Sequence, residues 1–158
     1  SLMTIAETFA LVSFSIFSYA DLRYRLVPGI EVFLFGTILL TFPATPIQTG
    51  IVLLACLWSI FRNLSGWFAI PLLFYPPVWP VLFTGYGYRK GIIGRADLLA
   101  ISGLACLFPL PAVLLSLLGL ELWRRLWIRR QQGNIPALPG LLLGLIVYLL
   151  LRLFLPSP

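Results

Sequence analysis

The stretch TIAETFALVSFSIFSYADLRYR, residues 4–25, decides the fold class. It begins with an apolar run from Thr4 to Ala20 and ends abruptly in the charged cluster Asp21-Leu-Arg-Tyr-Arg25. A run of this length is at the lower limit for a helix that crosses the hydrocarbon core of a membrane. The arginines that close it are typical of a membrane-helix end that stays in the cytoplasm.

The rest of the 158-residue chain has the same character. Sixty per cent of its residues are apolar and only 10% are charged, whereas a soluble domain has about 25% charged residues. Such a chain cannot cover itself with a water-compatible surface, which predicts an integral membrane protein. Leu-rich runs separated by short basic clusters favour bundled helices over a barrel of alternating strands. We therefore expect an all-α, polytopic membrane helical bundle that forms a single domain over residues 1–158.

The apolar runs predict about six transmembrane helices. The run Ile30 to Phe42 is bounded by prolines, and residues 51–85 predict either one broken crossing or a crossing followed by a re-entrant or interfacial piece. The run from Leu98 to Phe108 gives only about 16 Å of helix at 1.5 Å per residue. We therefore expect that helix to begin before Asp97, near Ile92. The last spans are residues 112–122 and 140–155, where Gly140-xxx-Gly144 suits a close helix–helix contact.

The positions of Arg and Lys predict the orientation, because positive residues of short loops stay in the cytoplasm. Both termini and the uncharged loops at 43–50 and 109–111 should then lie outside. Arg62 and Arg152 do not fit this pattern, and we expect Arg152 to snorkel to the outer interface. The net charge of +6 indicates topology and contact with anionic membrane lipids, and not nucleic-acid binding, because the basic residues are dispersed. The cytoplasmic clusters are Arg23/Arg25, Arg89/Lys90/Arg95 and Arg124/Arg125/Arg129/Arg130.

The composition excludes much catalytic chemistry. The chain has no His, so it cannot hold a Ser-His or Cys-His dyad, an HExxH zinc site or a His-ligated haem. Its two cysteines, Cys56 and Cys106, each lie alone in an apolar run and suit small buried positions. We expect no metal and no other cofactor. The five acidic residues are Glu7, Asp21, Glu31, Asp97 and Glu121.

The two aspartates fall on the same predicted side of the membrane and at similar depth. Asp21 ends the first span, and Asp97 lies at the start of the fourth. One interpretation is that each is an interfacial cap paired with a nearby arginine, which costs little at a helix end. The arginine would be Arg23 or Arg25 for Asp21 and Arg95 for Asp97. The other is that the two carboxylates form a catalytic pair.

Three motifs favour the catalytic pair. The segment Asp21-Leu-Arg23-Tyr-Arg25-Leu-Val-Pro28 resembles the first signature of the type IV prepilin and archaeal preflagellin peptidases, in which an aspartate is followed by basic residues and Ile/Val-Pro. Gly91-Ile-Ile-Gly94-Arg95-Ala96-Asp97 resembles their GxGD motif. Asn134-Ile-Pro-Ala-Leu-Pro139 resembles their Ile-Pro-x-x-Pro element before a late span.

This resemblance implies a membrane aspartic endopeptidase in which Asp21 and Asp97 are catalytic and the other motif residues support them. The substrate would be a prepilin-like or archaellin-like precursor, cut at the cytoplasmic face just before its hydrophobic helix. The chain departs from the family at Gly29, usually Asn, at Arg95 and Ala96, often Gly, and at Leu99, usually Lys. The bacterial enzymes' cysteine-bearing insertion is absent, which suggests the archaeal type without N-methylation.

The chemistry fits two carboxylates. One activates a water molecule while the other protonates the scissile carbonyl oxygen, and two close carboxylates share one proton because both cannot readily ionise. The pair would titrate as a unit, in a cavity that water reaches from the cytoplasm. The precursor's basic leader needs an acid nearby, and Glu31 is the best placed, although a first-turn acid favoured by the helix dipole is the simpler explanation of Glu31.

Two other functions remain open from the sequence. One is a small carrier or channel subunit in which the aspartates bind a cation or relay protons; the proline-rich region 71–80, as a broken helix, would suit it. The other is an inactive relative of the peptidases that acts in assembly. Cleavage of a leader-bearing precursor separates both from the peptidase.

Overall fold

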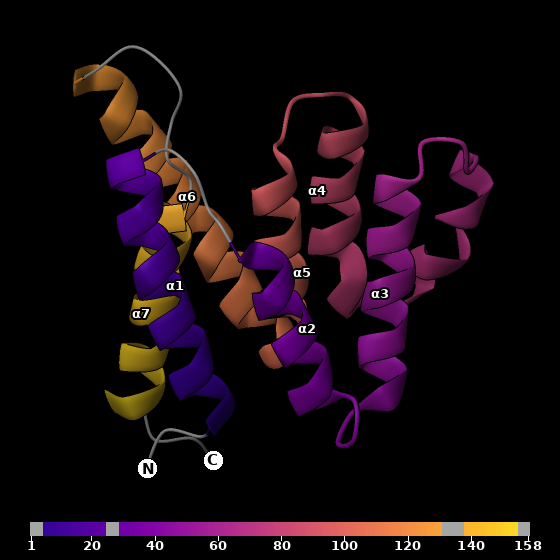
Figure 1. The fold of residues 1–158 in the computed structure, drawn as a ribbon, viewed down its shortest axis with the longest axis horizontal. Coiled ribbons are helices and arrows are strands. Elements are labelled where there is room, and N and C mark those ends of the chain that lie inside the picture. The colour runs from indigo at the N-terminus through magenta and orange to yellow at the C-terminus, as the bar shows by residue number, and fades with distance from the viewer. Residues whose placement is uncertain (1–4, 25–28, 131–137, 155–158) are drawn as a thin grey trace. The chain divides into compact units, whose positions relative to one another are not determined.

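The chain is all-helical, as expected. The computed structural model describes residues 5–24, 29–130 and 138–154, and every regular element in these ranges is a helix (Figure 1). The α-helices are α1 (Ile5–Tyr24), α2 (Ile30–Thr41), α3 (Pro46–Ile60), α4 (Trp79–Arg89), α5 (Arg95–Leu107), α6 (Leu110–Arg130) and α7 (Leu138–Phe154). Three short 3₁₀ helices separate α3 from α4: η1 (Gly66–Phe68), η2 (Pro71–Phe74) and η3 (Pro76–Val78).

One helix is long and apolar enough to cross a membrane. Among the described helices, α1 alone combines sufficient length with sufficient apolarity to cross a bilayer. The apolar helices α2, α3 and α7 have 12, 15 and 17 residues, which is short for a span of about 20 residues. A membrane-associated N-terminal helix is therefore supported, whereas six crossings remain a prediction.

The helices form two compact units. One contains α1, α6 and α7, and the other contains α2 to α5. In the first unit α1 and α7 run antiparallel, because Asp21 near the end of α1 contacts Leu138 at the start of α7, while Glu7 near the start of α1 contacts Arg152 near the end of α7.

Arg152 therefore differs from expectation. Its guanidinium forms a bidentate pair with the carboxylate of Glu7, which is 4% exposed. The sequence predicted a side chain that snorkels to water, but a buried carboxylate on the neighbouring helix neutralises the charge inside the unit.

Helices α6 and α7 meet through glycines, which confirms the close contact predicted for Gly140 and Gly144. A Cβ atom at Gly119 of α6 would lie 2.5 Å from the carbonyl oxygen of Gly140 and 2.6 Å from the backbone nitrogen of Gly144. A Cβ at Gly144 would overlap the backbone of Leu115 and Ser116. The two backbones thus touch directly, and only glycine fits at these positions.

In the second unit, the C-terminal ends of α3 and α4 lie together. Arg89, the last residue of α4, donates hydrogen bonds to the carbonyl oxygens of Trp58 (2.8 Å) and Leu64 (2.5 Å). Helices α3 and α4 therefore run in the same direction, and residues 61–78 double back beside α3 as a chain of 3₁₀ turns (Figure 1). For the region 51–85, this arrangement favours the prediction of one helix followed by a returning segment.

Helix α5 begins at Arg95, not near Ile92 as predicted. Gly91 has a φ of +79°, and Gly94 is extended with φ −79° and ψ 162°. These two conformations make residues 90–94 a turn and prevent α4 or α5 from extending through them. The predicted loops also shorten, because α3 already begins at Pro46 and α6 at Leu110.

Candidate functional site

Asp21 lies in the last turn of α1 and is half-buried. Its Oδ2 accepts a hydrogen bond of 3.3 Å from the backbone N–H of Leu138, the first residue of α7. The first N–H groups of a helix have no partner within the helix, and the helix dipole favours negative charge there. The carboxylate of Asp21 therefore caps α7 from a neighbouring helix, and α7 holds this carboxylate in place.

Asp97 lies in the first turn of α5 and is also half-buried. It is three residues after Gly94, the N-cap, at the position from which an acidic side chain reaches back toward the helix start. Its Oδ2 would lie 3.9 Å from a Cβ atom added at Gly94, so the carboxylate lies beside the start of the helix.

The motif glycines differ in what they require. Gly91 has a positive φ and no atom within 4 Å of an added Cβ, so its backbone conformation, not crowding, accounts for the glycine. Gly94 has a conformation open to any residue, with only the Asp97 carboxylate near. Ala96, between Arg95 and Asp97, is half-buried.

Arg95 and Glu31 form an ion pair of 2.5 Å that links the first turns of α5 and α2. Both side chains are more than half exposed, so the pair adds little stability. Its consequence is electrostatic: Arg95, two residues before Asp97, is neutralised by Glu31, the acid predicted to bind a basic leader.

The structure brings some predicted residues together and leaves others apart. Glu31, Arg95, Gly94 and Asp97 gather at one end of the second unit. Asp21 belongs to the first unit, so the pairing of the two aspartates remains a prediction. The guanidinium of Arg23 lies 5.9 Å from the ring centre of its neighbour Tyr24. Arg25 and Pro28 lie outside the described residues.

The second unit is charged at one end only. Within residues 29–110 all charged side chains lie at or just after the C-terminal ends of α3 and α4, or in the first turns of α2 and α5. Contacts join α2 to α5 and α3 to α4 at these ends, and the short turn at residues 90–94 connects α4 to α5. The opposite end, where Gln48 of α3 donates to the carbonyl oxygen of Ala105 of α5, carries no charged residue. Arg62, which did not fit the predicted topology, thus lies with the other cations. The charged residues are Glu31, Arg62, Arg89, Lys90, Arg95 and Asp97.

Two features were missed by sequence reasoning. Glu7 was not singled out, and its partner Arg152 is 145 residues away, so no local pattern links them. Arg89 was interpreted only as a topology signal, yet its hydrogen bonds tie the ends of α3 and α4 together. The run of basic residues at 89–90 after an apolar helix gave the only available signal for it.

Comparison with known proteins adds no relative: no family model, curated protein or solved structure matches this chain.

Proposed function

We propose that this chain is a multi-pass membrane aspartic endopeptidase of the prepilin and preflagellin peptidase type. In this proposal Asp21 and Asp97 form the catalytic pair at the cytoplasmic face and remove the short basic leader of a precursor protein. Archaellin-like and pilin-like precursors both have the required chemistry.

The hydrogen bond from Leu138 to Asp21 is the observation that carries the proposal. It joins the aspartate that begins the first signature to the Ile-Pro-x-x-Pro element, because Leu138 immediately precedes Pro139. These segments are 117 residues apart in sequence. Two motifs that belong to one active site must lie close together in space. Two motifs that match by chance have no reason to be in contact.

The distribution of charged and apolar side chains supports a multi-pass arrangement. Helix α2 exposes Val32, Phe35 and Leu39, each by more than 60%, which suits lipid and not water. All charges of α2 to α5 gather at one end, with four cations and two acids, as expected for a cytoplasmic face. Helices shorter than a full span then need local thinning of the bilayer or oligomerisation.

The departure at Gly29 is compatible with the family pattern. Gly29 precedes α2 with a φ of +82°, a left-handed conformation that glycine adopts freely and asparagine tolerates better than most residues. The residue that usually follows the signature proline could therefore take the same backbone conformation as the glycine found here.

The proposal assigns each residue a distinct role. One carboxylate of the pair removes a proton from the attacking water, while the other, protonated, donates to the scissile carbonyl oxygen. The N–H of Leu138 orients the carboxylate of Asp21. Glu31 is the nearest acid on the same unit as Asp97 for a basic leader, provided that the leader displaces Arg95 from it.

Cleavage of a leader-bearing precursor by the purified full-length chain in detergent tests the proposal. Asp21→Asn and Asp97→Asn should each abolish cleavage, because an amide cannot accept or relay the proton. Glu121→Gln is the matched control: Glu121 is another acid, paired with Arg124 and Arg125 on α6, and its loss should leave cleavage intact. Retention of turnover in either aspartate variant would overturn the catalytic pair.

A further inference from the structure

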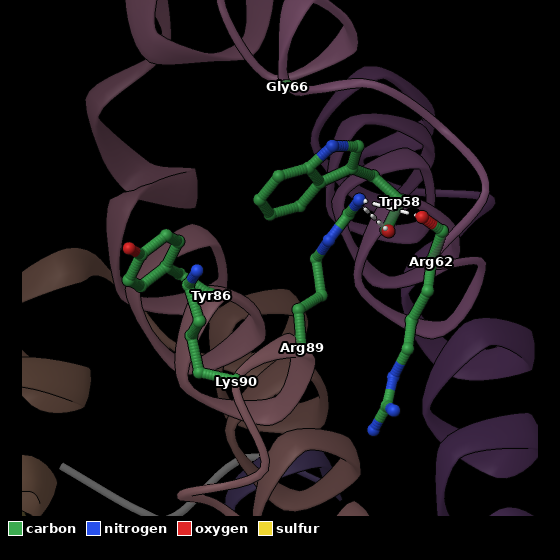
Figure 2. A pocket seen from close by; sticks show the side chains of 6 residues that line it. All are labelled: Trp58, Arg62, Gly66, Tyr86, Arg89 and Lys90. Carbon is green, nitrogen blue, oxygen red and sulfur yellow. Dashed lines mark hydrogen bonds between the residues drawn. The ribbon is translucent and has the colours of Figure 1, made fainter.

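A pocket of about 350 Å³ opens at the charged end of the second unit (Figure 2). It is lined by three cationic side chains, two aromatic side chains and one glycine: Arg62, Arg89, Lys90, Trp58, Tyr86 and Gly66. The volume lies in the range of small-ligand sites. No carboxylate lines it, and among the described residues none of its three cations forms an ion pair.

Arg89 lines this pocket and holds its neighbouring residues in place. Its guanidinium lies 4.5 Å from the ring centre of Trp58 and donates to the carbonyl oxygens of Trp58, Arg62 and Leu64. Figure 2 shows its side chain reaching past Arg62 toward the Trp58 ring. The indole N–H of Trp58 in turn donates to the carbonyl oxygen of Ser65. This network holds residues 62–66 over the pocket.

Arg62 and Lys90 are held less firmly. The ammonium group of Lys90 lies 5.5 Å from the ring centre of Tyr86, and the guanidinium of Arg62 lies 5.7 Å from that of Tyr88. Among the described residues the Arg62 side chain forms one hydrogen bond, to the Tyr88 carbonyl oxygen, and it is long at 3.4 Å. Both exposed cations therefore retain most of their N–H groups for an anion.

The segment next to the pocket indicates where the anion comes from. Trp67 and Phe68, which follow the pocket residue Gly66 in the first 3₁₀ turn, are exposed by 78% and 59%. Exposed aromatic side chains beside a basic cluster are typical of the interface between headgroups and acyl chains. A soluble anion bound in the pocket would leave these apolar side chains exposed to water. The acyl chains of a bound lipid would cover them.

We infer that this pocket binds the phosphate group of an anionic phospholipid headgroup, with Arg62 and Lys90 as its direct ligands. The basic leader of a precursor would be repelled by these three cations, so the pocket is separate from the leader-binding surface. The inference goes beyond the proposed peptidase activity and does not depend on it.

The inference is tested by measuring the binding of short-chain phosphatidylglycerol to the purified full-length chain in neutral detergent. Native mass spectrometry detects the bound lipid. The double variant Arg62→Gln/Lys90→Gln should weaken binding about tenfold or more, because two charge-assisted contacts are lost. Gly66→Leu should weaken it without any change of charge, because Gly66 lines the pocket and an added Cβ there meets open space. Arg125→Gln, which removes one exposed cation from α6, should bind as the unmodified chain does.

Four results would overturn the inference. Equal loss in the double variant and in Arg125→Gln would indicate attraction to the general basic surface, and normal binding by Gly66→Leu would exclude the pocket. Equal binding of phosphatidylcholine would show that the headgroup charge is not recognised. Displacement of the lipid by equimolar glycerol phosphate or inorganic phosphate would assign the pocket to a soluble phosphate compound. Circular dichroism and size-exclusion profiles identical to the unmodified chain establish that each variant is folded.

Discussion

The Oδ2 of Asp21 and the backbone N–H of Leu138 are 3.3 Å apart, although the residues are separated by 117 positions in the chain. This contact gives Asp21 a structural role as the cap of α7, independent of any catalytic role. The two roles make different demands on the side chain: capping needs an acceptor oxygen, whereas proton transfer needs a carboxyl group.

Asp21→Asn and Asp21→Ala should therefore behave differently. The amide oxygen of Asn can still accept from Leu138, so we expect Asp21→Asn to keep the thermal midpoint of the unmodified chain. Ala removes the acceptor and should lower the free energy of unfolding by about 0.5–2 kcal/mol, as for other lost helix caps. Thermal unfolding in detergent measures both. Equal destabilisation by the two variants would show that the start of α7 is stabilised by the negative charge of Asp21 and not by its hydrogen-bond-accepting oxygen.

Gly144→Ala should destabilise the first unit. The added methyl group would overlap the backbone of Leu115 and Ser116, and such overpacking costs about 1–3 kcal/mol. Gly50→Ala is the matched control, because Gly50 lies inside α3 with nothing within 4 Å of an added Cβ; alanine there should be neutral or mildly stabilising. Thermal midpoints in the same detergent give the comparison. A Gly144→Ala chain as stable as the unmodified one would contradict the close backbone contact.

Breaking the Glu7–Arg152 pair should also be costly. Glu7 is 4% exposed and the Arg152 side chain is 32% exposed, so removal of Arg152 leaves a buried acid without its cation. We expect Arg152→Gln to destabilise by about 1–3 kcal/mol, below the full cost of a buried pair because Arg152 is partly solvated. The double variant Glu7→Gln/Arg152→Gln should recover a substantial part of this loss. If the double variant is no more stable than Arg152→Gln, the two side chains are not coupled.

Cysteine labelling in oriented vesicles tests the topology. With Cys56 and Cys106 replaced by alanine, single cysteines at positions 62 and 92 should label from the same side, because the ends of α3 and α4 lie together. A cysteine at position 44, between α2 and α3, should label from the opposite side. Labelling of 62 and 92 from opposite sides would contradict a parallel α3 and α4 in the membrane.

The sequence allowed the helical class and the glycine contact to be predicted because both depend on local patterns. Composition fixes the class, and Gly140 and Gly144 are one turn apart on a single helix. The path of residues 61–78 was left open because four prolines within ten residues break regular periodicity without showing where the chain turns.

The contacts of the candidate site were less predictable because their partners are distant in sequence. The position of Arg62 at the charged end of the second unit depends on a distant contact, because its backbone carbonyl oxygen accepts a hydrogen bond from Arg89, 27 residues later in the chain. In the same way, Arg95 was expected to act on its near neighbour Asp97, whereas its ion pair is with Glu31 on another helix. Charge placement indicates which side of a membrane a residue faces, but not which of several opposite charges it meets.

The Glu31–Arg95 pair leads to a prediction about pH dependence. If Asp21 and Asp97 share a proton, the cleavage rate should form a bell whose two limbs belong to the pair. Arg95 favours ionised carboxylates nearby, so Arg95→Gly should move the alkaline limb upward, and the Glu31 charge left behind acts in the same direction. Glu31→Gln leaves Arg95 uncompensated and should move that limb downward. Because both side chains are more than half exposed, each shift should be only a few tenths of a pH unit.

The double variant Glu31→Gln/Arg95→Gly is the control, because it removes both charges and should return the alkaline limb to its original position. Initial cleavage rates between pH 4 and 9 at fixed ionic strength measure all four profiles. Opposite shifts in the single variants that cancel in the double variant require that both charges act on one titrating site. Shifts that do not cancel would mean that Glu31 contacts the leader itself, and a flat profile in the unmodified chain would exclude the shared proton.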